Sequence, residues 1–181
     1  MASIIREADV GDSAIIATVV RTAFRASAER FELTHENCPT HPSFCTKEWV
    51  EADMKRTVRY YILEIERRIG GCAALEQVHD EISFLQKLAV LPNHRRKGYG
   101  RALVHHILRE AQTQGARVVR VAVITEFATL VKWYKKIGFI EVKSDRVANL
   151  PFGVTILERA FRDQNPAKSF ANPSSSAAIK S

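Results

Sequence analysis

Segment 88–101 constrains the fold of this chain most, because it joins an apolar strand to an amphipathic helix through a basic loop that contains glycines. The strand pattern stops at Pro92, and Gly98 and Gly100 stand where the helix begins. The basic side chains of this segment are Arg95, Arg96, Lys97 and Arg101. Free backbone N–H groups at a helix N-terminus bind anions, and glycine lets a ligand approach the backbone closely. The segment therefore predicts a strand–loop–helix unit that holds a phosphate group.

The spacing of the glycines excludes two common phosphate-binding loops. The chain has neither the Gly-x-x-x-x-Gly-Lys-(Ser/Thr) sequence of a P-loop nor the Gly-x-Gly-x-x-Gly sequence of a dinucleotide-binding loop. Taken alone, Arg-x-x-Gly-x-Gly also fits a glycine-rich turn with a solvated basic face. Other features of the sequence are needed to distinguish a phosphate-binding loop from a glycine-rich turn with a solvated basic face.

The net charge of +7 is concentrated around this loop. Residues 82–109 contain six Lys or Arg residues and no Asp or Glu, and a local positive excess favours an anionic ligand. Nucleic acid would also satisfy this charge. However, the chain has no zinc-finger or RNP-type motif, and its aromatic residues are not interleaved with the basic ones. We therefore expect no nucleic-acid partner.

The composition is that of a soluble globular protein, with 46% hydrophobic and 26% charged residues in 181. No apolar run approaches the roughly 18 residues of a membrane helix, and the N-terminus lacks the apolar core of a signal peptide. Three cysteines give no sign of a disulfide framework. We expect a cytoplasmic protein without membrane contact.

Hydrophobic periodicity predicts an α/β fold with a mixed sheet. Strands are predicted over residues 3–6, 58–66, 69–77, 82–91, 118–124, 139–143 and 154–159. Helices are predicted from Asp9 or Asp12, from Thr46, from the glycine loop to Gly115, and over residues 128–137 before Gly138. Three successive strands precede the glycine loop, which excludes a regular doubly wound fold.

The chain is expected to form one domain over residues 1–162. Residues 163–181 consist largely of Pro, Ser, Asn, Ala and Lys. Such a segment cannot bury enough apolar surface to order itself, so it is predicted to be a disordered C-terminal tail.

Two short motifs stand one strand and half a helix apart. The first is Arg95-Arg96-Lys97-Gly98-Tyr99-Gly100, which follows Leu88-Ala89-Val90-Leu91-Pro92. The second is Trp133-Tyr134-Lys135-Lys136-Ile137-Gly138-Phe139. Together with the order of elements over roughly residues 3–160, they resemble the GNAT superfamily of acetyl-CoA-dependent N-acetyltransferases. The resemblance implies the acyl-CoA N-acyltransferase fold, a mixed, mostly antiparallel sheet with a splayed central strand pair flanked by helices.

The resemblance assigns the donor acetyl-CoA to two stretches of backbone. The strand residues Leu88, Ala89 and Val90 would hydrogen-bond the pantetheine arm. Main-chain N–H groups of the loop would hold the pyrophosphate, and the loop residues are Arg95, Arg96, Lys97, Gly98, Tyr99, Gly100 and Arg101. No metal is implied. The chain departs from the family at Glu126 and Phe127, where many members have an Asn that contacts CoA.

The resemblance also places Tyr134 near the thioester sulfur. A phenol has an ordinary pKa of about 10, so it would act as a general acid that donates a proton to the departing thiolate. The general base that accepts the amine proton is less defined. Glu81 and Glu76 are the candidates that we retain, with His79 and Asp80 beside them, and each also fits a solvated turn residue.

In this superfamily the acceptor site lies between the segment joining the first two helices and the segment joining the last two strands. Here these are residues 31–46 and 150–152, and the predicted lining residues are His35, Asn37, His41 and Phe152. Cys38 and Cys45 in the same loop raise the alternative of a zinc site. Their spacing matches no zinc motif, so we predict no metal.

The sequence therefore predicts transfer of an acetyl group from acetyl-CoA to a primary amine of a small molecule, by direct attack on the thioester. Two alternatives stay open: a non-catalytic acyl-CoA-binding or sensing domain, and a protein acetyltransferase acting on Lys or an N-terminus. Homodimers are frequent in the superfamily, but the sequence identifies neither the oligomeric state, the acceptor amine nor the length of the acyl group.

Overall fold

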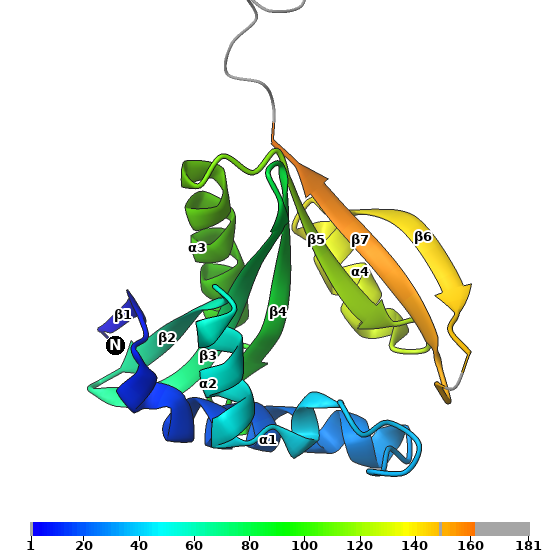
Figure 1. Cartoon of the computed structure of the whole chain (residues 1–181), viewed down its shortest axis with the longest axis horizontal. Helices are drawn as coiled ribbons and strands as arrows, with labels where there is room; N and C mark the ends of the chain where they lie inside the picture. Colours follow the sequence, from blue (N-terminus) through cyan, green and yellow to red (C-terminus); the bar gives the residue numbers. More distant parts are fainter. Residues whose placement is uncertain (1, 149, 162–181) are drawn as a thin grey trace, which may run out of the picture.

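The computed structural model describes residues 2–148 and 150–161, which form a seven-stranded sheet with helices on both faces (Figure 1). The strand order is β1-β2-β3-β4-β5-β7-β6, and only β4 and β5 run parallel to each other. The strands are β1 (Ser3–Glu7), β2 (Arg59–Ile65), β3 (Arg68–His79), β4 (Ile82–Val90), β5 (Val118–Ile124), β6 (Ile140–Arg146) and β7 (Gly153–Ala160). The predicted α/β class and the mixed, mostly antiparallel sheet are confirmed. The predicted tail lies outside the described residues.

The α-helices are α1 (Ser13–Arg30), α2 (Lys47–Lys55), α3 (Tyr99–Thr113) and α4 (Ala128–Lys136). Every predicted element in this part of the chain is present, although β6 continues three residues beyond its predicted end because it pairs with β7 as far as Gly153. The loop predicted over residues 31–46 contains a short 3-10 turn at Pro42–Phe44.

Polar side chains begin the first two α-helices as the sequence predicts, with one difference. The Thr46 hydroxyl accepts a hydrogen bond from the Trp49 N–H and caps α2. Asp9 caps a 3-10 turn (Val10–Asp12) that precedes α1, since its carboxylate accepts from the Gly11 N–H. Asp12 does not cap α1 itself, because its carboxylate binds the Arg6 guanidinium at 2.8 Å.

The two faces of the sheet carry separate apolar cores. Helices α3 and α4 cover one face, which we call the donor face, and its largest buried side chains include Tyr61, Leu75, Leu85, Leu103, Ile107 and Leu157. Helices α1 and α2 cover the opposite, acceptor face around Ile16, Val20, Val50, Tyr60 and Ile62. Among the described residues, no helix combines the length and apolarity that crossing a membrane requires.

Candidate active site

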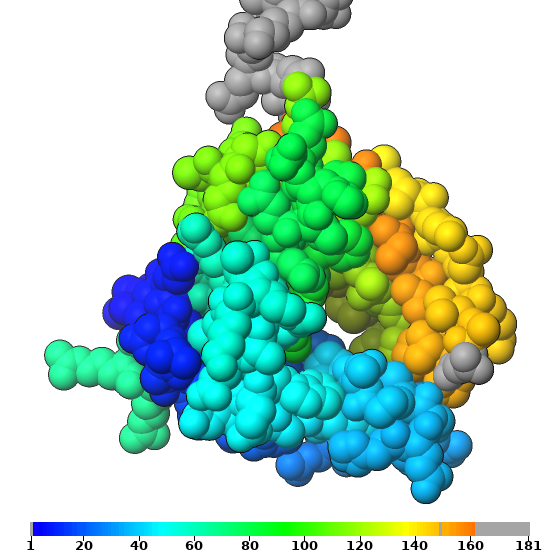
Figure 2. All heavy atoms as spheres, viewed as in Figure 1, coloured from blue at the N-terminus to red at the C-terminus, as the bar shows by residue number. Residues whose placement is uncertain are grey.

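Strands β4 and β5 separate after a short parallel contact. They pair only between Ile82–Phe84 and Val118–Arg120, although β4 continues to Val90 and β5 to Ile124. Beyond that contact, the edges of both strands that face each other have no partner strand in the described part of the chain, and Figure 1 shows them diverging toward α1. Figure 2 shows a hollow at this place, between segments coloured blue, green and orange. The gap between β4 and β5 is the predicted splay, and it lies directly before the glycine loop.

The first turn of α3 has free backbone donors. Gly98 stands at its N-cap with φ +85, and no side chain caps the helix. The first helical hydrogen bond runs from the Ala102 N–H to the Gly98 carbonyl, so the N–H groups of the three residues between them have no partner within the helix. Arg96 also has a positive φ, so two left-handed residues stand in this loop directly before the helix. These donors fit a pyrophosphate.

The basic side chains of the loop do not all contribute charge in the same way. Arg95 donates from Nε to the Val90 carbonyl at 3.0 Å and from Nη2 to the Ala23 carbonyl at 2.7 Å. Its guanidinium therefore fastens the loop to the end of β4 and to α1. The remaining cations of the loop, Arg96, Lys97 and Arg101, are exposed.

The two helices on the donor face meet at the glycine loop. A Cβ at Gly100 would stand 3.6 Å from the Trp133 ring, so α3 and α4 approach closely there. Tyr134 is 3% exposed and packs edge-on against Trp133 and Phe139, with ring centroids 4.9 and 5.4 Å away. Burial raises the pKa of Tyr134 above its ordinary value, so the phenol keeps its proton at neutral pH. A protonated phenol on the donor face is compatible with the predicted general acid.

Residues 88–90, which are predicted to hold the pantetheine arm, are packed on both faces of the strand. Leu88 and Val90 pack against the donor-face core, while Ala89 is buried in the acceptor-face core. The backbone edge of this segment toward β5 has no strand partner among the described residues, although the Val90 carbonyl accepts a hydrogen bond from Arg95. Tyr99, the remaining loop residue, lies half-buried with its ring 6.3 Å from that of His94.

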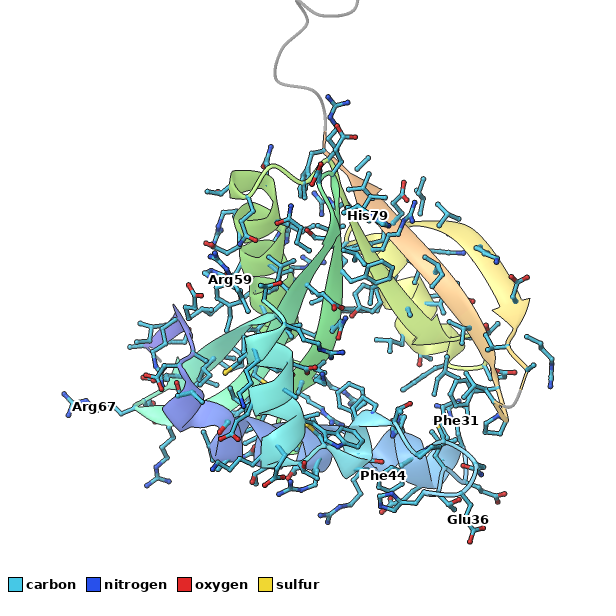
Figure 3. The ribbon with its side chains drawn as sticks, viewed as in Figure 1. Phe31, Glu36, Phe44, Arg59, Arg67 and His79 are labelled. Carbon is cyan, nitrogen blue, oxygen red and sulfur yellow. The ribbon has the colours of Figure 1, made fainter. Side chains whose placement is uncertain are left out.

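The two candidate bases lie in different places. Glu81 precedes β4 and pairs with Arg117 at 3.0 Å, at the end of the sheet where β4 and β5 are still together. Figure 3 shows His79 at this same end, far from Phe31 on the opposite side of the hollow. Seven residues of strand separate Glu81 from Leu88, which is roughly 23 Å. Glu76, opposite Phe84 on β4, lies nearer the gap, so of the two candidate bases we prefer Glu76.

Glu76 belongs to a row of side chains that crosses four strands on the acceptor face. The strand register pairs Glu76 with Phe84, Phe84 with Arg120, and Arg120 with Glu158. Gln86, one step closer to the gap, donates a hydrogen bond to the Glu76 carboxylate. Arg120 donates to Glu158 at 2.8 Å. The sequence reasoning missed Gln86, Arg120 and Glu158, although their alternation with apolar residues in each strand is the signal that could have found them.

The predicted acceptor-loop residues mostly hold the loop itself together. Asn37 accepts from the Thr34 N–H at 2.8 Å and donates to the Glu32 carbonyl at 2.9 Å. The His35 ring is exposed and stacks on Phe44 with centroids 3.8 Å apart. These contacts shape the segment that borders the hollow.

His41 is buried, and its Nδ1 accepts a hydrogen bond from the Ser43 N–H at 3.2 Å. The Ser43 hydroxyl lies 2.8 Å from the same nitrogen, and the His41 Nε2 lies 3.5 Å from the Ser27 hydroxyl. Burial lowers the pKa of His41, so the ring is neutral at pH 7. A neutral, bonded imidazole supports the loop rather than exchanging protons with an acceptor.

Phe152 connects the two sides of the hollow. It is 7% exposed and belongs to a small apolar cluster, the clasp, whose buried members are Ala28, Leu33, Cys38 and Phe152. Phe31 at the end of α1 also packs against Phe127 on the far side, with ring centroids 5.9 Å apart. Figure 3 places Phe31 beside the tip of the β6–β7 hairpin. The clasp therefore closes one side of the hollow.

The three cysteines are buried thiols in two separate places. Cys38 lies in the clasp, while Cys45 and Cys72 lie in the core under α1 and α2. Burial raises the pKa of all three thiols, and that of Cys72 to about 12. Within the described ranges, no three His, Cys, Asp or Glu side chains converge as metal ligands.

Comparison with known proteins agrees with this geometry. The sequence model of the acetyltransferase (GNAT) family matches residues 20–139, well over half of the chain. A ribosomal protein bS18-alanine N-acetyltransferase of Salmonella typhimurium is 32% identical over 85 residues, which are 46% of this chain and 57% of that protein. The alignment thus spans little more than half the length of that relative.

Two solved structures share the fold over nearly the whole described chain. The ribosomal-protein-S18-alanine N-acetyltransferase of Escherichia coli superposes with a TM-score of 0.73 at 17% identity, covering 93% of this chain and all of that one. The PaiA N-acetyltransferase of Thermoplasma acidophilum, in complex with coenzyme A, gives 0.74 at 17% identity, covering 89% of this chain and all of that one. The predicted fold is confirmed, and the predicted enzyme class and acetyl-CoA co-substrate are confirmed at the level of the family. With its matching sequence model, its splayed strands and its uncapped glycine loop, the chain belongs to the GNAT acetyltransferase family.

Proposed function

We propose that this protein transfers the acetyl group of acetyl-CoA to a primary amine. The observation that carries the proposal is the gap between β4 and β5, with the uncapped N-terminus of α3 and the buried Tyr134 on one face and Glu76 on the other. A thioester held in this gap would be open to an amine from the acceptor face. The donor and the acceptor would then meet from opposite sides of the sheet.

In the proposed reaction, the amine nitrogen attacks the thioester carbonyl carbon and the carbon–sulfur bond breaks, leaving its electron pair on sulfur. Tyr134 donates its proton to that sulfur and recovers one from solvent. Glu76 lies beside Phe84, four residues and roughly 13 Å of strand before Leu88. That span exceeds the reach of a carboxylate, so Glu76 would take the amine proton through water, with Gln86 holding one of its oxygens.

The clasp supports a small acceptor. Because Phe152 and Leu33 pack together across the hollow, a folded protein surface would have to displace them to reach the gap. The free N-terminus of a polypeptide is narrow enough to enter the same hollow. The names of the bS18-alanine N-acetyltransferases describe such an acceptor and make it the second candidate.

The test is an acetyl-transfer screen that follows free CoA thiol and identifies the product by mass spectrometry. The acceptor panel contains small mono- and diamines, amino acids and short peptides with free N-termini. Thiol release with a small amine would support the primary proposal, and release with peptides alone would favour the second candidate. Stabilisation by acetyl-CoA without any thiol release would favour a non-catalytic acyl-CoA sensor.

A further inference from the structure

Lys87 has an unusual backbone conformation at the point where β4 leaves its neighbour. Its φ is +46, a region that lysine adopts rarely and at a cost. The β3–β4 register steps from Ala74↔Gln86 to Cys72↔Ala89, so β4 contains one extra residue in a bulge around Lys87. Bulges bend a strand and redirect its edge. This bulge directly precedes Leu88, the first residue of the predicted pantetheine-binding edge.

The Lys87 side chain is fastened to helix α2. Its ammonium group pairs with the Asp53 carboxylate, and the two side chains are only 13% and 9% exposed. Asp53 also accepts from the Tyr60 hydroxyl at 2.6 Å and from Arg56 at 2.7 Å. The Lys87 ammonium lies 5.5 Å from the Tyr60 ring centroid. We call the Lys87–Asp53 ion pair the tether. Separating a buried ion pair leaves charges without compensation, so the tether strongly resists movement of the bulge.

We propose that Lys87 is a positioning residue for acetyl-CoA: its tether to Asp53 holds the bulge, and the bulge keeps the 88–90 edge of β4 away from β5. The inference rests on the proposed function of this gap. Facing strands with free N–H and C=O groups tend to pair, because unpaired backbone groups are costly once they lose water. Without the tether, β4 would be free to straighten toward β5 and fill the space that the pantetheine arm needs.

The test separates the pantetheine arm from the phosphate loop. Acetyl-CoA and adenosine 3′,5′-bisphosphate, which lacks the arm, are titrated calorimetrically into the full chain and into Lys87→Met. We expect Lys87→Met to weaken acetyl-CoA at least tenfold and to change the bisphosphate less than twofold. Lys87→Arg, which keeps the charge, should recover most of the acetyl-CoA affinity, and adding Asp53→Asn to Lys87→Met should weaken it little further.

Arg6→Met is the matched control, because Arg6 joins Asp12 and Glu64 in a half-buried ion pair on β1 and β2, away from the gap. It should lower the melting temperature while leaving both affinities unchanged. Equal weakening of the two ligands by Lys87→Met, or no weakening of either, would overturn the proposal.

A measurement without ligand distinguishes this proposal from the proposed function. Hydrogen exchange in residues 121–124 should slow in Lys87→Met, because β5 would gain a partner on its free edge. Unchanged exchange would refute the tether even if acetyl-CoA binds. If the wild-type chain binds neither ligand but exchange slows as expected, the proposed function fails and the tether stands.

Discussion

Replacing Gly98 by alanine should weaken both the fold and CoA binding, whereas the same replacement at Gly100 should not weaken the fold. Gly98 has φ +85, and no atom lies within 4 Å of the place where its Cβ would stand. Sterically the position is open, so only the backbone conformation opposes a side chain. An L-residue in the left-handed region costs about 1–2 kcal/mol. At Gly100 the φ is not positive, and a Cβ would meet Trp133 at 3.6 Å and Val90 at 3.9 Å, which are ordinary contacts.

These energies translate into measurable changes of opposite sign. For a chain of this size, a loss of about 1–2 kcal/mol lowers the melting temperature by about 2–8 °C. If the loop in Gly98→Ala relaxes instead to a negative φ, the N–H groups of the first turn lose their common direction. The same energy then appears as a weakening of acetyl-CoA binding by about 5–30-fold. Alanine at a compatible helical position stabilises a protein by about 0.4–1 kcal/mol, so Gly100→Ala should raise the melting temperature.

Thermal unfolding with and without acetyl-CoA, together with calorimetric titration, measures both effects. Asparagine tolerates the left-handed region better than alanine does, so Gly98→Asn should recover part of the loss. The reasoning is refuted if Gly98→Ala matches the wild-type chain in stability and affinity. It is also refuted if Gly100→Ala lowers the melting temperature more than Gly98→Ala does, since the cost would then come from space rather than from backbone conformation.

Three further substitutions test the proposed chemistry and the loop. Tyr134→Phe should lower kcat by about 10²–10⁴-fold while the affinity for acetyl-CoA stays within about twofold, because a general acid acts only in the transition state. Equal loss of kcat and of affinity would indicate a packing role. Glu76→Gln should lower kcat near pH 7 and regain activity at high pH, where the amine loses its proton unaided; a pH-independent loss would argue against the base assignment. Burial lowers the pKa of His41 below its unfolded value of about 6.5. Just below that pH the unfolded state therefore binds more protons than the folded state, and the free energy of unfolding falls as the pH drops. His41→Asn keeps an acceptor for the Ser43 N–H but removes the titrating imidazole. Between about pH 5 and 6.5, the free energy of unfolding measured with urea should therefore depend less steeply on pH in this variant than in the wild-type chain. An equally steep dependence would contradict this reasoning.

The donor side could be predicted from the sequence because its determinants are local. A strand that stops at Pro92, followed by Gly98 at a helix start, requires a turn with a left-handed residue and an uncapped helix, and both are present. Tyr134 precedes Gly138 by one helical turn, which places it on the buried side of α4. Backbone rules and helical periodicity act over a few residues, so a single sequence contains them.

Other features depend on contacts between distant segments, and the sequence does not reveal them. Arg95 looks like a ligand for phosphate in the motif, yet its guanidinium binds a carbonyl of α1 that is 72 residues away. Lys87 is an ordinary polar residue in a strand segment of the sequence, and its contact with Asp53, 34 residues away, becomes visible only in the fold. The same limit applies to Glu76 and Gln86, whose pairing depends on the register of two strands.

The acceptor side could not be predicted from the sequence for a related reason, namely that its parts come from segments far apart in the chain. The match to the family ends at residue 139, before the β6–β7 connection that supplies Phe152. Phe152 closes the hollow against Leu33, which lies in the segment between α1 and α2. The residues proposed to hold the donor thus belong to the part of the chain that matches the family. The clasp, which we propose limits the acceptor, combines a matched segment with an unmatched one. Acceptor size should therefore depend on Phe152 far more than on the glycine loop, and a smaller side chain at this position should admit bulkier amines without changing the affinity for acetyl-CoA.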